Sequence, residues 1–265
     1  MTRFGRSYNS RINRLLLVIV LVWAFWEPIA RIPDTIRNLP FAIDYVSKMV
    51  PPDFTILPSL WGPLLETLQM AIVGTVTATA LAFPISFLAA RNTAPCIAVL
   101  TITRGGLSFL RSMPEIAWAL LFVSLSGLGM LAGVLGIVCH TVGAMGKMFF
   151  ECVESTGPKM QSEIEAMRID GATELQIIRH GIVPEIMPLA ASYTLYRFES
   201  TIRTSAIMGL VGAGGLGLEL TMAVRMFRRQ QASAIILTIV ALVVCVDLAS
   251  SIIRGRILQG GGYTA

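Results

Sequence analysis

Long apolar runs separated by short polar stretches dominate the chain. Six runs predict membrane-spanning helices: residues 15–26, 64–88, 108–128, 130–150, 189–212 and 232–253. The first is short for a bilayer of about 30 Å and needs residues 28–30, or a locally thin membrane, to cross. The pattern therefore predicts an all-α integral membrane protein of about six helices, with one transmembrane domain over residues 15–255 and polar tails at 1–14 and 256–265.

The stretches between these runs predict the connections. Residues 31–62 combine prolines with mixed charges, which is typical of an external segment with a short surface helix. Residues 91–106, with two arginines and two adjacent glycines, are expected to form a connecting loop. The second run carries Glu66 and Gln69 near its outer end. Small residues recur through 130–150 and allow close approach of neighbouring helices in lipid.

One polar segment, residues 151–188, predicts a helix–turn–helix at a membrane surface. The sequence Thr-Gly-Pro at 156–158 is a helix-start signal, because a proline in the first turn loses no intrahelical bond. Apolar side chains follow at helical spacing, at Met160, Ile164 and Met167. Gly171 suits the left-handed residue that commonly ends a helix.

The second half of this segment carries its own boundary signals. Thr173 and Gln176 form a capping-box pattern that opens a helix. Pro184 and Pro188 are expected to close it. The segment as a whole is therefore predicted to be a compact cytoplasmic helical hairpin.

This hairpin resembles the EAA loop of ABC-importer permeases, whose pattern is E-A-A-x-x-x-G, nine residues, then I-x-L-P. The matching positions are Glu165, Ala166, Gly171 and Pro184. The chain departs from the pattern at Met167, Gly181 and Val183. The resemblance implies that residues 151–188, with Glu165, Ala166, Gly171, Val183 and Pro184, form a coupling loop that docks into a groove on a separate ATPase. An ordinary cytoplasmic hairpin is the alternative interpretation.

Composition and charge agree with a membrane protein. Only 14% of the 265 residues are charged and the mean hydropathy is +0.71, whereas soluble domains average about 25% charged residues. With both termini in the cytoplasm, cytoplasmic segments hold 13 of the 21 Lys and Arg residues, as the positive-inside rule requires. Three external arginines, Arg225, Arg228 and Arg229, oppose the rule. No dense basic run predicts nucleic-acid binding.

Several motifs with chemical meaning are absent or misleading. Residues 212–217 match G-x-G-x-x-G, but a membrane helix precedes them in place of the strand that a dinucleotide site needs. No phosphate-binding G-x-x-x-x-G-K-[ST] occurs. The four cysteines, Cys96, Cys139, Cys152 and Cys245, are expected to be free and buried. His140 and His180 lack metal-site spacing and are expected to be structural.

Further resemblances concern the subfamily. Residues 211–217 resemble the V-G-A-G-G-L-G segment of importer permeases. Four stretches resemble the phosphonate/phosphite branch: 51–54, 111–115, 118–123 and 192–199, the last reading Ser-Tyr-Thr-Leu-Tyr-Arg-Phe-Glu. The resemblance covers roughly residues 50–254. It implies a type I ABC importer permease fold in a bacterial inner membrane, and a non-catalytic subunit that carries a phosphonate or phosphite by alternating access.

The same resemblance implies partners. They are a second copy of the chain, a cytoplasmic ATPase dimer, a periplasmic substrate-binding protein and membrane lipid. The chain itself is expected to need no cofactor, because ATP and Mg²⁺ would bind the ATPase. Alternatives are an importer of another solute such as an amino acid, an ion-driven secondary transporter, and a membrane-embedded enzyme. No internal repeat supports the second, and no catalytic dyad supports the third.

Three ionisable residues in the fifth run are candidates for the translocation pathway: Arg197, Glu199 and Arg203. Charges at that depth are costly and usually face a bundle interior, a partner or water. Glu199 and Arg203 are four residues apart, and are therefore expected to pair on one helix face. Either this pair only holds helices together, or Arg203 attracts a passing oxyanion while Glu199 limits its affinity.

Overall fold

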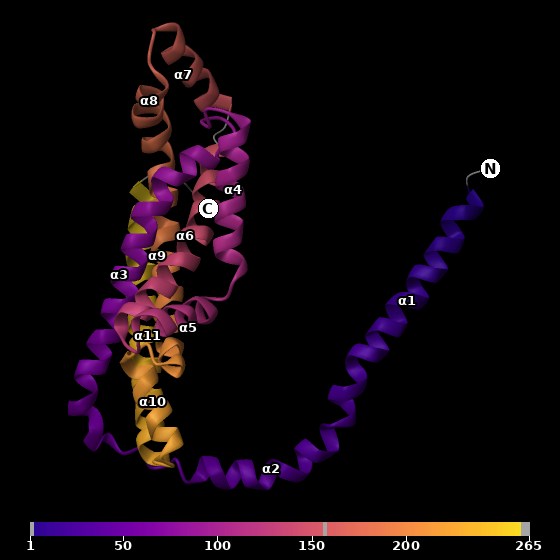
Figure 1. Cartoon of the computed structure of the whole chain (residues 1–265), viewed down its shortest axis with the longest axis vertical. Helices are drawn as coiled ribbons and strands as arrows, with labels where there is room; N and C mark the ends of the chain where they lie inside the picture. Colours follow the sequence, from indigo (N-terminus) through magenta and orange to yellow (C-terminus); the bar gives the residue numbers. More distant parts are fainter. Residues whose placement is uncertain (1–2, 156–157, 261–265) are drawn as a thin grey trace. The chain divides into compact units, whose positions relative to one another are not determined.

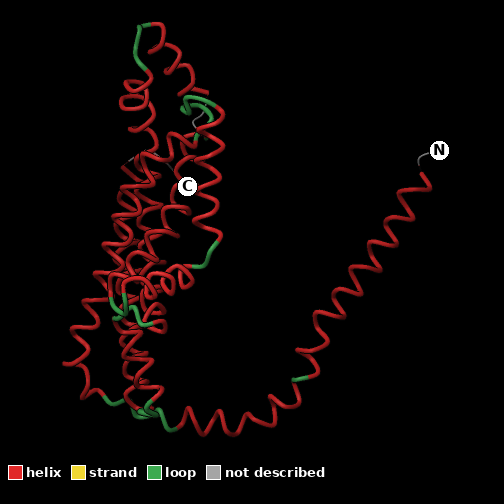
Figure 2. Tube along the Cα trace, in the orientation of Figure 1, coloured by secondary structure: helices red, strands yellow, loops and turns green. Residues whose placement is uncertain are grey.

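The computed structural model describes residues 3–155 and 158–260, and every regular element within these ranges is a helix (Figure 2). The all-α prediction is confirmed. Two compact units are distinguished, Met1–Pro51 and Pro52–Ala265. Four described helices are long and apolar enough to cross a membrane, and two bent helix pairs bring the number to six if each pair is one span.

The first unit consists of α1 (Arg3–Ala30) and α2 (Ile32–Ser47). Helix α1 begins inside the stretch 1–14 that was expected to be a polar tail, and α2 is the helix predicted within residues 31–62. Surface ion pairs with 2.5 Å separations join Arg31 to Glu27 and Lys48 to Asp44. The apolar side chains from Leu16 to Ile29 are exposed within this unit.

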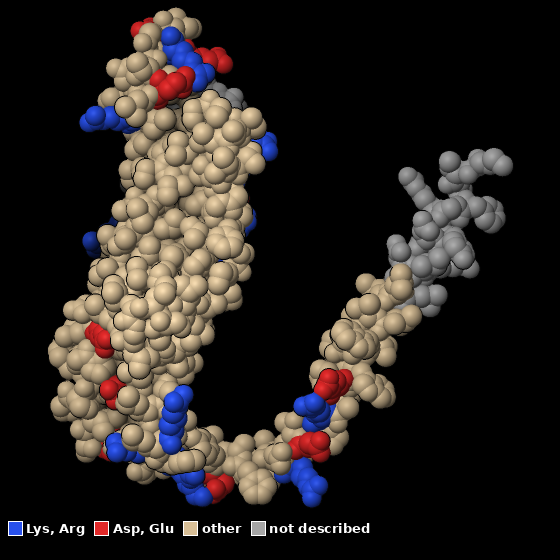
Figure 3. Space-filling model, in the orientation of Figure 1, with Lys and Arg blue, Asp and Glu red and all other residues tan. Residues whose placement is uncertain are grey.

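Four long helices form the body of the second unit: α3 (Leu57–Ala89), α6 (Met130–Glu154), α9 (Val183–Met208) and α11 (Arg229–Gly260) (Figure 1). On the face drawn in Figure 3, charged side chains of this unit gather over α7 and α8 at one end and near α10 at the other. The wall between these ends is almost free of charge, as a hydrocarbon-facing surface requires.

Small residues on α6 allow the close packing that the sequence predicts. A Cβ at Gly136 would lie 2.8 Å from the backbone nitrogen of Ala119, and a Cβ at Gly143 would lie 2.6 Å from the carbonyl oxygen of Leu107. Helix α6 therefore contacts α4 (Ile97–Ser112) and α5 (Glu115–Ser126) almost backbone to backbone. Phe149 and Met145 fill the interior on the side of α3 and α9.

The predicted span 108–128 is not one helix. Helices α4 and α5 meet at an angle of 86°, with Met113 extended and Pro114 preceding the first residue of α5. Proline disfavours a helical residue before it and lacks the N–H that would continue the ladder. The predicted loop 91–106 is also wrong in its second half, because α4 begins at Ile97.

The predicted boundaries around 189–212 also need correction. Pro184 and Pro188 do not close a short helix, since Pro184 lies in the first turn of α9 and Pro188 lies inside it. A first-turn proline is compatible with a helix because its missing N–H would be unpaired there. Helix α10 (Gly215–Arg225) was not predicted, and α11 extends beyond both ends of the expected 232–253.

The cysteine prediction is half right. All four thiols are free, but only Cys152 is buried; Cys139 is half-buried, while Cys96 and Cys245 are exposed on the single chain. An exposed position within a membrane-spanning helix can still face lipid or another subunit, and burial cannot be read from hydropathy alone.

Candidate functional site

The hairpin consists of α7 (Pro158–Ile169) and α8 (Glu174–Ile177). The proposed start at Thr156 and Gly157 lies outside the described residues. Gly171 has φ +82°, as predicted. The Ala172 N–H donates to Met167 O (2.9 Å) and the Gly171 N–H to Arg168 O (3.1 Å). These two bonds form a Schellman motif, which reverses the chain within four residues.

The predicted capping box is present at the start of α8. The Thr173 backbone N–H donates to Gln176 Oε1 (2.7 Å), and the Gln176 N–H donates to Thr173 Oγ1 (3.4 Å). Between α8 and α9, residues Ile178–Ile182 form a π-helix. The chain is therefore helical without interruption from Glu174 into the long helix α9.

Apolar contacts fix the hairpin to the ends of the membrane helices. Ile177 and Ile182 are buried beside Val153 at the end of α6 and Ala90 after α3, and Ile164 and Met167 pack against the same cluster. The hairpin is a rigid extension of the bundle, because its two helices share one core with α3 and α6.

Hydrogen bonds and an ion pair join the segments beneath the hairpin. Arg104 of α4 pairs with Glu154 of α6, and its Nε donates to Ala89 O (2.8 Å). The backbone N–H of Arg91 donates to Glu154 Oε1 (2.7 Å). The guanidinium of Arg104 also lies over the Phe150 ring, 4.6 Å from its centroid. The ends of α3 and α6 are thus tied to the middle of α4 where the hairpin leaves the bundle.

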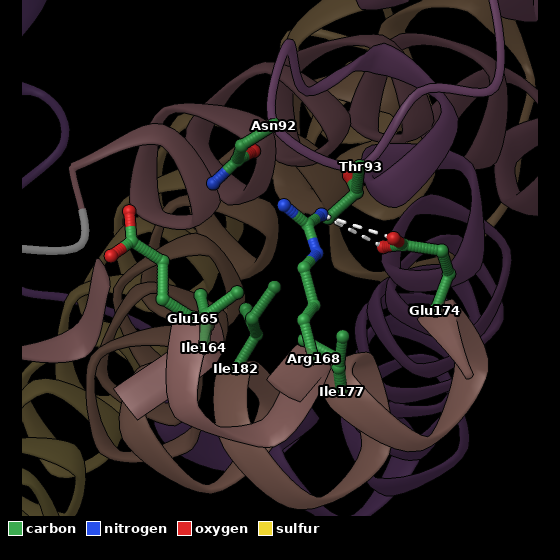
Figure 4. Close-up of a pocket in the computed structure, with 8 residues that line it drawn as sticks. All are labelled: Asn92, Thr93, Ile164, Glu165, Arg168, Glu174, Ile177 and Ile182. Atoms are coloured by element: carbon green, nitrogen blue, oxygen red, sulfur yellow. Dashed lines mark hydrogen bonds and ion pairs between the residues drawn. The ribbon is translucent and has the colours of Figure 1, made fainter. Parts of the chain in front are cut away.

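A cavity of about 270 Å³ lies between the hairpin and residues Asn92 and Thr93, which follow α3. Figure 4 shows Arg168 reaching across it to Glu174, with nitrogen-to-oxygen distances of 3.0 and 3.2 Å, while Glu165 points away from the pair. This exposed ion pair contributes little to stability. It does, however, link the last turn of α7 to the first residue of α8.

Exposed residues of the hairpin define the surface available to a partner. Glu165 and Ala166 are exposed, as the EAA resemblance implies. Two large apolar side chains near the turn are also exposed, Ile169 (86%) and Leu175 (74%). The family pattern did not indicate these two residues, because it marks positions that shape the turn. The exposure of apolar side chains at the tip of the hairpin can be recognised only when the positions of α7 and α8 are known.

Ion pairs in α9 differ from the predicted arrangement. Glu199 and Arg203 do not pair with each other: Arg203 Nη1 contacts both carboxylate oxygens of Asp247 on α11 at 3.1 Å, and Glu199 Oε1 lies 3.7 Å from Arg254. Spacing along one helix gives adjacency, but it cannot reveal opposite charges on an antiparallel neighbour. Among the described residues, Glu199 Oε1 has no hydrogen-bond partner.

Arg197 lies in the most enclosed of these charged groups. Its Nη2 contacts Glu115 Oε1 in the first turn of α5, and Nε and Nη2 donate to Thr141 Oγ1 of α6 at 3.2 and 3.0 Å. The side chains of Arg197 and Glu115 are only 14% and 11% exposed. His140 Nε2 is 3.7 Å from the same carboxylate oxygen. We call Arg197, Glu115, Thr141 and His140 the central cluster.

The glycine-rich segment 209–217 forms the connection between α9 and α10. Gly214 and Gly215 have φ of +92° and +68°. The Gly215 N–H donates to Glu66 Oε2 and the Leu216 N–H to Thr67 Oγ1, both at 2.9 Å. Glu66 thus caps α10 from α3, because a carboxylate is favoured at a helix N-terminus. The sequence indicated the glycines but not this partner.

Comparison with known proteins gives the family. Residues 82–259 match the model of the binding-protein-dependent transport system inner membrane component. The phosphite transport system permease protein PtxC of Stutzerimonas stutzeri is 36% identical over 95% of this chain and 91% of its own length. The phosphate-import permease protein PhnE of Mycolicibacterium smegmatis is 35% identical over 91% of this chain, but only 44% of its own length is covered.

Solved structures show the same fold. An inward-facing structure of the MetNI methionine ABC transporter matches with a TM-score of 0.68 and 20% identity, covering 77% of this chain and 99% of that chain. An amino acid ABC transporter crystallised with histidines matches with a TM-score of 0.63 and 15% identity, over 76% of this chain and 95% of that one. At these identities the similarity shows the fold alone.

Proposed function

The chain belongs to the family of inner membrane components of binding-protein-dependent transport systems, and we propose that it is the permease subunit of an ATP-driven importer of phosphite or a related phosphonate. One observation carries this substrate class: the similarity to the phosphite permease extends over 95% of the chain. Similarity to a probable D-methionine permease of Vibrio cholerae covers only 34%, so an amino acid importer is the weaker alternative.

The hairpin is the proposed coupling element. Exposed Glu165 and Ala166, together with Ile169 and Leu175, form the surface that would enter a groove on an ATPase. Val183 and Pro184 start α9, so a displacement of the hairpin is transmitted directly into a membrane helix. Two copies of the permease would act with an ATPase dimer that binds ATP and Mg²⁺, and with a periplasmic binding protein that delivers the cargo.

Alternating access then requires two conformations within a few kcal/mol of each other, so that nucleotide and cargo can shift the population. Arg197, Glu199 and Arg203 remain the proposed pathway residues. Their three different partners on α5 and α11 give them separate environments: Arg197 and Glu199 are enclosed, whereas Arg203 is 45% exposed.

Uptake by the reconstituted system tests the proposed cargo. The permease, its ATPase and its binding protein are placed in liposomes with ATP on the ATPase side, and accumulation of radiolabelled phosphite is measured against methionine. We expect ATP-dependent phosphite uptake that unlabelled phosphonates compete for. Uptake of methionine without any phosphorus oxyanion would assign the chain to amino acid import instead.

Cysteine labelling tests the topology. The variant Glu174→Cys is expected to react with a membrane-impermeant maleimide only from the cytoplasmic side, and Asp44→Cys only from outside, since residue 174 lies on the hairpin and residue 44 on α2. Each variant is made in a background in which Cys96 and Cys245, exposed on the single chain, are replaced by serine. The opposite labelling pattern would contradict the six-span topology with cytoplasmic termini.

A further inference from the structure

We propose that Glu115 is a built-in competitor for the cargo: its carboxylate occupies, on Arg197 and beside Thr141, the place where a phosphorus oxyanion binds inside the permease, and the two anions exchange during transport. This inference rests on the proposed function, because the exchange matters only if the cargo is an oxyanion. It assigns a specific role to the central cluster that no resemblance supplies.

The geometry of the central cluster is that of an anion site with an internal anion in it. The guanidinium of Arg197 directs Nη2 at Glu115 Oε1, and Thr141 Oγ1 lies 3.0 Å from the same nitrogen. A guanidinium fork beside a hydroxyl matches an anion with several oxygens, because charge-assisted bonds form to more than one oxygen at a time. The guanidinium comes from α9 and the hydroxyl, whose oxygen accepts from it, comes from α6, whereas the carboxylate comes from α5.

His140 borders the site. Its Nδ1 lies 2.9 Å from the carbonyl oxygen of Met113, and since a carbonyl only accepts, Nδ1 must donate there. The neutral ring then has only a lone pair at Nε2, which lies 3.7 Å from Glu115 Oε1 and does not donate to it. The Nδ1 bond fixes the imidazole to the elbow between α4 and α5, so that an anion replacing the carboxylate would meet Arg197, with Thr141 and His140 beside it.

A carboxylate of the permease itself offsets two disadvantages of a buried arginine in a transport path. An unpaired guanidinium at this depth is costly, and it would hold an oxyanion too tightly for release. If Glu115 is paired with Arg197 for about 99% of the time, the apparent dissociation constant of the cargo rises about 100-fold. The site is then weak enough for passage, yet the charge is never left without a partner.

The other ion pairs of α9 lack this combination. Arg203 and Asp247 are 45% and 42% exposed, and Glu199 is 3.7 Å from Arg254 without a hydrogen bond to its Oε1. Among the described residues, the central cluster is the one ion pair of α9 that brings a guanidinium, a hydroxyl and a carboxylate together from three helices. Because Arg203 is itself a proposed pathway residue, the matched control is the partly exposed pair Lys147 and Glu151 of α6, which are 3.4 Å apart.

The test compares four permeases within the full complex with ATPase and binding protein: Glu115→Gln, Arg197→Gln, the double variant with both changes, and the control Lys147→Gln/Glu151→Gln. Radiolabelled phosphite binding is measured on the permease–ATPase complex without binding protein, and phosphite uptake is measured in liposomes with it. Thermal stability of each complex is recorded with and without phosphite.

For Glu115→Gln we expect phosphite to bind about 10- to 100-fold more tightly than to the unaltered complex, since the competitor is removed, and uptake to slow because release becomes limiting. Phosphite should also raise the thermal stability of this variant. The double variant has no unpaired charge, and it should fold normally while taking up little phosphite. The control should transport at close to the unaltered rate.

Wild-type uptake by a well-folded double variant would overturn the proposal, because the pair would then be structural. Unchanged phosphite affinity in Glu115→Gln would overturn it as well. If the unaltered complex carries methionine and no phosphorus oxyanion, the proposed function is wrong. If the complex takes up phosphite but substitutions at Glu115 and Arg197 change neither binding nor uptake, only the proposed exchange is wrong.

Discussion

Replacing Gly217 by alanine is expected to prevent the permease from accumulating in folded form. Gly217 lies in the first turns of α10, where an added Cβ would overlap the carbonyl oxygen of Ala206 near the end of α9. Gly209 faces it, and a Cβ there would overlap the backbone nitrogen of Leu218. Backbone atoms cannot rotate away, so α9 and α10 would have to separate.

Overpacking a well-packed interior costs about 1–3 kcal/mol when side chains can adjust, and more when they cannot. We expect a loss of at least about 3 kcal/mol for Gly217→Ala, a large part of the 5–15 kcal/mol that stabilises a typical domain. Fluorescence-detected size-exclusion chromatography of solubilised membranes measures the folded fraction.

The matched control is Gly105→Ala in α4, where an added Cβ meets no atom within 4 Å apart from its chain neighbours. Because alanine favours a helix by about 0.5–1 kcal/mol over glycine, this variant should accumulate at least as well as the unaltered protein. A monodisperse Gly217→Ala permease at normal yield would mean that α9 and α10 are not held in the close contact described above.

Gly171→Val is expected to uncouple ATP hydrolysis from uptake while leaving the membrane bundle intact. Gly171 has φ +82° and no atom within 4 Å of an added Cβ, so its requirement is conformational and not steric. A β-branched residue in the left-handed region is strained by about 1–2 kcal/mol, which shifts the hairpin toward other turn geometries by about tenfold or more.

The measurement is the ratio of phosphite taken up to ATP hydrolysed in the reconstituted complex, together with the amount of ATPase retained on the permease. Gly171→Asn is the control, since asparagine tolerates left-handed backbone, and it should keep most of the coupling. Full, cargo-stimulated uptake by Gly171→Val would remove the hairpin from the coupling pathway.

Local signals in the sequence were reliable where short-range chemistry decides the structure. The left-handed Gly171 and the capping box of Thr173 and Gln176 were predicted, because each depends on residues within one turn. The all-α character follows from hydropathy alone. Glycines of α6 were expected to allow close packing, and Gly136 and Gly143 do so.

Two of the failures have the same physical cause, which is competition from distant parts of the chain, and the third has a local one. Arg203 pairs with Asp247 and not with Glu199, because an antiparallel helix provides a carboxylate that no local pattern reveals. Glu66 caps a helix 149 residues further along the chain. The elbow before Glu115 was missed although Pro114 indicates it, since the continuous apolar run around it favours a single helix.

The π-helix at Ile178–Ile182 limits how the connection between hairpin and membrane helix can change in length. A π turn holds one residue more than an α turn, so a deletion within it can be absorbed by forming an α turn. A deletion in the first turns of α9 would instead rotate everything before it by about 100° relative to the rest of α9. The exposed Gln176 would then take the angular position of Ile177, which is 1% exposed against the core beneath the hairpin. Single-residue deletions in the first turns of α9 are therefore expected to be lost from natural variation, whereas changes by whole helical turns would keep the same face inward.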